Sequence, residues 1–159
     1  MRKRSKYRPK GVLPDTMAYV TAGFKPIAEH NEYLLDLRIK NHEALMTLTR
    51  GKATRQDLDV LITAFNIVEA LYRLGFGADY KDVVAKGLDA VRTVAGRGVQ
   101  TNKFVLRAEE MHAINLMMEL HDAQLDIITV RDMEQAIKDV EREYRSNKMV
   151  KIPTKGTYG

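Results

Sequence analysis

Apolar residues recur along most of the chain at the three- and four-residue spacing of amphipathic helices, and no segment alternates as a strand would. Between residues 26 and 50 the apolar positions are Ile27, Leu34, Leu37, Leu45 and Leu48. The whole pattern predicts helices over 15–22, 26–50, 55–74, 79–95, 105–128 and 130–147. We therefore predict an all-α, single-domain bundle of five main helices plus a short N-terminal helix.

Capping residues and glycines set the predicted helix ends. Thr54-Arg55-Gln56-Asp57 and Thr129-Val130-Arg131-Asp132 have the form of a capping box in which Asp replaces the usual Glu. Gly96-Arg97-Gly98 predicts the end of the helix over 79–95. Gly87 falls inside the apolar stripe of that helix, which predicts a close crossing with a neighbouring helix.

The helix over 105–128 is apolar around most of its circumference, which is typical of a central, buried helix. Its one polar strip lies at spacings of three and four residues and consists of His112, Asn115, Glu119, Asp122 and Asp126. This strip is either the solvated side of the helix or an acidic docking groove for a partner. By contrast, the helix over 130–147 has a narrow apolar stripe and is expected to pack on the outside.

Composition removes several classes of function. The chain has 159 residues and no cysteine, which excludes disulfides, thiol nucleophiles and cysteine-based metal sites. No segment approaches the roughly 20 apolar residues of a membrane helix, and no apolar segment follows the basic N-terminus as in a secretory signal. No phosphate-binding loop or hydrolase motif is present. We therefore expect a cytoplasmic, non-enzymatic protein without a cofactor or a membrane partner.

Charge is unevenly distributed along the chain. The formal net charge is +5, from 26 basic and 21 acidic residues. Residues 1–10 and 148–159 hold nine basic residues and no acid, which leaves 17 basic residues against all 21 acids between them, a net charge of −4. The sequence thus predicts a basic arm over 1–14, a slightly acidic helical domain over 15–147 and a basic tail over 148–159.

The N-terminal arm is the most specific candidate for a binding site. Its basic residues can neutralise phosphates, and Tyr7 can stack on a base. The candidate nucleic-acid-binding residues are Arg2, Lys3, Arg4, Lys6, Tyr7, Arg8 and Lys10. The alternative is a solvated tail, because the folded body shows no matching basic face in the sequence.

A polar cluster interrupts the apolar faces of two predicted helices. It consists of His30, Arg38, Asn41 and His42 on the first helix and Glu69 on the second. Because a buried guanidinium needs a carboxylate, we expect Arg38 to pair with Glu69. The cluster is then either a structural ion pair with satisfied histidines, which we favour, or the charged centre of a pocket or interface.

A metal site is not expected. Glu109-x-x-His112 matches half of the ligand set of di-iron helical bundles. The chain contains no second Glu-x-x-His, so the coordination sphere cannot be completed.

Several short stretches resemble a family of small uncharacterised proteins encoded by phages and prophages of Gram-negative bacteria. They are Lys6-Tyr7-Arg8-Pro9-Lys10, Ile39-Lys40-Asn41-His42, Arg50-Gly51-Lys52-Ala53-Thr54-Arg55, Leu120-His121-Asp122-Ala123-Gln124, Ile128-Thr129-Val130 and Asp132-Met133-Glu134. The resemblance implies a phage or prophage setting in a bacterial cytoplasm. It implies no activity and no role for any residue.

Three hypotheses follow, and they leave the oligomeric state open. The first is a non-enzymatic phage or prophage accessory or regulatory protein that contacts nucleic acid or a nucleoprotein assembly through its basic arm. The alternative is a protein-interaction module, an inhibitor or adaptor of a host or viral protein, that acts through the acidic helical body. A third, less supported hypothesis is an enzyme that uses the polar cluster or the strip on 105–128.

Overall fold

The computed structural model describes residues 23, 25–29 and 31–154, and this part of the chain is helical. Its five α-helices are α2 (Asn31–Thr49), α3 (Arg55–Arg73), α4 (Lys81–Thr101), α5 (Ala108–Ile127) and α6 (Val130–Arg145). Two short 3-10 helices, η1 (Ile27–Glu29) and η2 (Ala78–Tyr80), precede α2 and α4. The predicted all-α fold with five main helices is confirmed, whereas the predicted helix over 15–22 lies outside the described residues.

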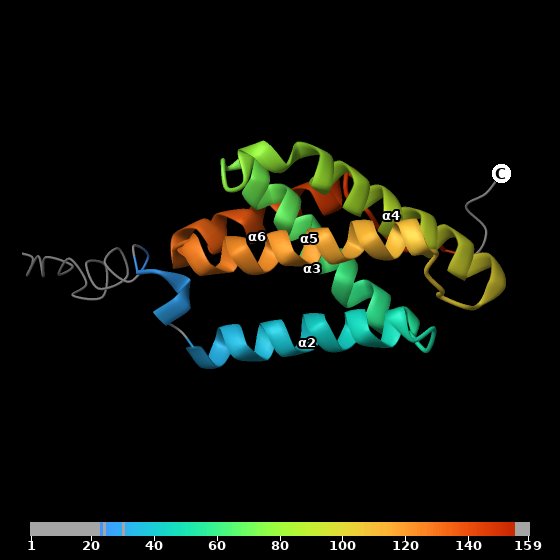
Figure 1. Cartoon of the computed structure of the whole chain (residues 1–159). Coiled ribbons are helices and arrows are strands. Elements are labelled where there is room, and N and C mark those ends of the chain that lie inside the picture. Colours follow the sequence, from blue (N-terminus) through green and yellow to red (C-terminus); the bar gives the residue numbers. More distant parts are fainter. Residues whose placement is uncertain (1–22, 24, 30, 155–159) are drawn as a thin grey trace, which may run out of the picture.

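The central helix of the bundle is α3, not the predicted helix over 105–128. Each of the other four α-helices packs against α3, and its side chains Leu58, Leu61, Phe65, Val68 and Leu71 are fully buried. Figure 1 shows α2 along one edge of the bundle, with α5 crossing in front of α3. The polar strip of α5 leaves that helix partly exposed, which is why it cannot be the central one.

Two helix starts, those of α3 and α6, follow the predicted caps. In the box that opens α3, the main-chain N–H of Asp57 donates to Thr54 Oγ1 at 3.3 Å, and the Thr54 N–H donates to Asp57 Oδ2 at 2.7 Å. Thr129 and Asp132 repeat this reciprocal pair at the start of α6. Asp therefore closes the box although its side chain is one methylene shorter than Glu.

The predicted end of the fourth helix is wrong, because α4 continues through Gly96 and Gly98 to Thr101. A Cβ on Gly98 would lie 2.1 Å from Cδ1 of Phe104, so the glycine admits the buried Phe104 ring and does not end the helix. At Gly87 a Cβ would lie 2.8 Å from the Met117 side chain. The close helix crossing predicted there is therefore confirmed, between α4 and α5.

The predicted boundary at residue 147 is also wrong, because the segment that follows α6 packs on the bundle. Met149, Val150 and Ile152 are buried, and the Asn66 amide donates to the main-chain oxygen of Val150 at 3.1 Å. The Nζ of Lys151 donates to the main-chain oxygen of Tyr144 at 2.8 Å. Only residues 155–159 of the predicted tail lie outside the described part. None of the described helices has the length and apolar character needed to cross a membrane.

We predict that Gly98→Ala destabilises the protein by about 1–3 kcal/mol, because the added methyl overlaps the Phe104 ring. Urea unfolding of a double-mutant cycle with Phe104→Ala provides the test. In the Phe104→Ala background the Gly98→Ala change should cost nothing or stabilise, because the ring is gone and alanine favours the helix. An equal cost in both backgrounds would contradict the proposed contact.

Candidate functional site

The predicted arm cannot be placed, since all seven of its candidate residues and His30 lie outside the described residues. The described chain begins beside the start of α6. There the main-chain oxygen of Lys25 accepts a hydrogen bond from the Val130 N–H at 3.1 Å, and the Ile27 N–H donates to the Ile128 oxygen at 3.0 Å. The chain therefore enters the bundle at the end where α2 and α6 begin.

The structure joins two sets of candidate residues that the sequence analysis kept apart. Arg38 Nη2 on α2 donates to Asp126 Oδ1 at 2.5 Å and to the main-chain oxygen of Asp122 at 3.2 Å. His42 Nε2 lies 2.8 Å from Asp122 Oδ2. Part of the predicted polar cluster and part of the predicted strip thus form one network between α2 and α5, which we call the α2–α5 polar cluster (Arg38, His42, Asp122 and Asp126).

The predicted pair between Arg38 and Glu69 is wrong. Glu69 instead accepts a hydrogen bond from Arg73 at 2.7 Å, one turn along α3, and Arg73 also binds Glu143 of α6. The reason is the direction of the two faces: Glu69 lies on the side of α3 that meets α6, whereas Arg38 lies on the side of α2 that meets α5. Helical spacing alone does not fix which partner each face receives.

The α2–α5 polar cluster lies at the surface. The Arg38 side chain is 32% exposed and that of Asp126 is 63% exposed. The other members of the predicted strip diverge: Asn115 and Glu119 point to solvent, and His112 lines a separate hollow. No group of His, Asp and Glu among the described residues is arranged to hold a metal ion.

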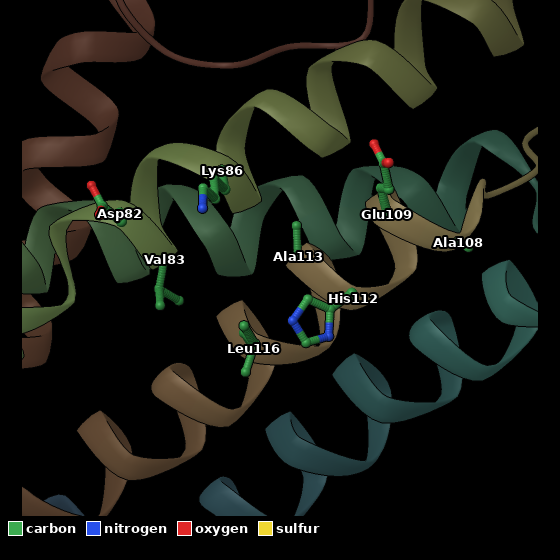
Figure 2. A pocket seen from close by; sticks show the side chains of 8 residues that line it. All are labelled: Asp82, Val83, Lys86, Ala108, Glu109, His112, Ala113 and Leu116. Carbon is green, nitrogen blue, oxygen red and sulfur yellow. The ribbon is translucent and has the colours of Figure 1, made fainter.

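That separate hollow lies between α4 and α5 and measures about 570 Å³. Figure 2 shows Val83 and Lys86 reaching it from α4 and His112, Ala113 and Leu116 from α5. Glu109 stands on its rim, so the two residues of the half metal motif belong to this hollow. Its lining contains no hydroxyl or thiol nucleophile, and we assign no reaction to it.

Two polar side chains on facing helices are buried inside the bundle. Asn41, a member of the predicted polar cluster, is buried on α2 as expected. Its amide nitrogen has no hydrogen-bond partner in the described structure. His121 on α5, which the sequence analysis did not single out, is fully buried, and neither of its ring nitrogens has a hydrogen-bond partner among the described residues. Burial lowers the pKa of His121 to about 4, because an apolar surrounding disfavours the imidazolium. His121 falls on the apolar arc of the helix predicted over 105–128, and this position is the feature of the sequence that indicates its burial.

Five exposed cations that the sequence analysis did not group lie together at one end of the bundle. An antiparallel bridge pairs Ala53 with Phe104 and sets the α2–α3 turn beside the α4–α5 loop. The turn and the first residue of α3 contribute Arg50, Lys52 and Arg55, and the loop contributes Lys103 and Arg107. We call these five residues the basic end, and none of them forms a close ion pair within the described structure, although the charge of Arg107 helps to lower the pKa of Glu110.

Two of the acidic residues near the basic end, Glu110 and Asp57, are held by other contacts, whereas Glu109 and Asp59 are exposed. The two terminal guanidinium nitrogens of Arg97 donate to the Glu110 carboxylate, at 2.8 and 2.6 Å, and the pair lowers the pKa of Glu110. Glu110 also accepts from the Arg107 N–H, and Arg97 donates to the Val105 oxygen. Asp57 caps α3. These contacts fix the loop and leave the five cations of the basic end facing solvent.

We predict that acid destabilises the protein through His121. The unfolded histidine titrates near pH 6.5 and the folded one near 4. Its stabilising contribution is complete above pH 6.5 and is lost as the pH falls towards 4. Because one pKa unit is about 1.4 kcal/mol, the loss is about 3 kcal/mol. Urea unfolding at pH 7 and pH 4 should show that His121→Leu removes this part of the pH dependence, and a slope shared by both proteins would contradict it.

We also predict that Arg38→Ala costs less than about 1 kcal/mol, because its carboxylate partner Asp126 is exposed to water. Arg97→Ala should cost more, since its bidentate partner Glu110 is mostly buried and would lose its main cation. Thermal unfolding of the two variants side by side is the measurement. A larger loss for Arg38→Ala would show that the α2–α5 polar cluster is a structural core contact.

Comparison with known proteins gives no relative from which a role could be transferred. No family model matches the chain, and neither a curated protein nor a solved structure matches it. The phage or prophage setting implied by the resemblance therefore stays a prediction.

Proposed function

We propose that the protein is a non-enzymatic accessory or regulatory protein that contacts nucleic acid through two basic regions, the N-terminal arm and the basic end. The observation that carries this proposal is the basic end, where five exposed cations gather on a body whose overall charge is acidic. Clustered Lys and Arg side chains bind phosphates by releasing condensed counterions, and they need no sequence-specific contact to do so.

Most arginines of the helical body outside the basic end form ion pairs within the chain. Arg38, Arg73, Arg97 and Arg142 each bind a carboxylate of the chain. The cations of the basic end have no such partner within the described residues, so they can bind phosphate without breaking an internal ion pair. The helical body therefore has a locally positive surface although its net charge is negative.

The arm supplies a second basic region, with six cations and no acid within residues 1–10. The described chain begins next to η1, before the first turn of α2, whereas the basic end follows the last turn of that helix. A helix of 19 residues is about 28 Å long at 1.5 Å per residue. Figure 1 shows η1 and the α2–α3 turn at opposite ends of α2. We therefore expect the contributions of the arm and the basic end to be separable by mutation.

We predict that a fluorescent 30-base-pair DNA duplex binds the full chain with an affinity that falls steeply with salt. Replacing Arg50, Lys52 and Lys103 with Gln should make the slope of log K against log salt shallower by about 2–3, because each neutralised phosphate contributes about 0.9 to that slope. Deleting residues 1–10 should reduce the slope independently. Fluorescence anisotropy between 50 and 300 mM salt measures both effects.

The matched control replaces three exposed lysines outside the basic end, Lys40, Lys86 and Lys138, with Gln. It changes the net charge by the same amount, so a long-range charge effect would weaken DNA binding equally in both triple variants. Equal weakening, or no DNA retention by the full chain at 50 mM salt, would overturn the proposal.

A further inference from the structure

Helix α2 has a second apolar face that no described part of the chain covers. Its first face packs into the bundle through Leu34, Ala44 and Leu48. On the other side, Leu35 is 59% exposed, and Ile39 and Met46 are each 45% exposed. Figure 1 shows α2 at the edge of the bundle. Because these three side chains are exposed, this side of the helix is open to solvent.

The exposed residues follow the spacing of a helix-packing seam. Leu35, Ile39, His42, Met46 and Thr49 are separated alternately by four and three residues, which is the repeat that lets one helix bury a stripe against another. We call these five residues the α2 seam. Isolated exposed apolar residues are common on protein surfaces, whereas a run in this register is suited to a second helix.

Acidic side chains border the α2 seam on both sides. Glu32, Asp36 and Glu43 of α2 are exposed on one side, and Glu119 and Asp126 of α5 are exposed beyond the other. Of the cations nearby, Arg38 is already bound to Asp126, which leaves Lys40 and, past Thr49 at the C-terminal end of the seam, Arg50 of the basic end. A helix that packs on the seam therefore meets a negative border.

The negative charge of this border favours some occupants of the α2 seam over others. A second copy in antiparallel orientation would place Glu43 close to the copy's Asp36, and in parallel orientation it would stack Glu32 on Glu32. Both arrangements set like charges together. A helix with basic residues beside its apolar stripe meets opposite charges instead.

We propose that the α2 seam is the docking surface for an amphipathic helix of a partner protein, with apolar residues in heptad spacing and Lys or Arg beside them. The mode is that of a helix laid along an apolar groove, in which the apolar stripe gives the affinity and the charged border gives the register. The α2 seam gives the alternative hypothesis, a protein-interaction module, a specific set of contact residues. Docking on this seam does not depend on nucleic-acid binding at the basic end.

The experiment uses the full chain and a labelled 21-residue probe peptide of three heptads, with Leu at the seam positions and Lys beside them. We expect this peptide to bind the chain in fluorescence anisotropy. Leu35→Ser with Ile39→Ser should weaken that binding at least tenfold. The same peptide with Glu in place of Lys should also bind at least tenfold more weakly at low salt.

The matched control is Tyr80→Ser with Ile127→Ser, which removes two equally exposed apolar side chains from other parts of the bundle. It should leave peptide affinity unchanged, and circular dichroism should show both double variants folded, since all four side chains are exposed. Equal weakening by the two double variants overturns the proposal, as does equal binding of the Lys and Glu peptides. A dimer of the chain in sedimentation velocity that Ile39→Ser dissociates would also overturn it, because the occupant would then be a second copy.

Discussion

Burial of the apolar side chains of α3 is the constraint on which the rest of the structure depends. This helix contributes to both apolar clusters of the bundle, one with α4 and the C-terminal half of α2, the other with η1 and α6. Each of the other α-helices packs against α3, and α4 and α5 also pack extensively on each other. Because α3 is covered on most sides, the exposed features proposed to bind partners lie on the other helices, on the connections between them and, with Arg55, at the start of α3.

The α4–α5 loop is the best example of packing that creates a surface. Phe104 lies against the bare backbone of Gly98, and the Arg97–Glu110 pair holds the two helix ends together. Both contacts bring the loop onto the α2–α3 turn, where Ala53 pairs with Phe104. The cations of the basic end thus meet because of apolar and ionic contacts beneath them, although the turn and the loop are far apart in sequence.

Helix α2 shows the opposite situation, in which a surface results from the absence of a neighbour among the described residues. Apolar residues occupy two of its faces, and the described bundle covers only one. The α2–α5 polar cluster lies between the covered face and the exposed apolar residues of the α2 seam, and His42 belongs to both, because it contacts Asp122 of α5. A charged boundary of this kind keeps the seam at the surface, because closing α5 further over α2 would bury the ion pairs of the cluster.

The sequence by itself determined the number and nature of the helices, their capped starts and the close crossing at Gly87, because periodicity, capping and the size of glycine act locally. It also located the concentrated charge of the arm, which is a property of adjacent residues. Only the tertiary structure decided the partner of Arg38, the burial of His121, the central place of α3, the packing of residues 148–154 and the assembly of the basic end. Each of these depends on the direction in which one helix face meets another, and helical spacing defines a face without defining what it contacts.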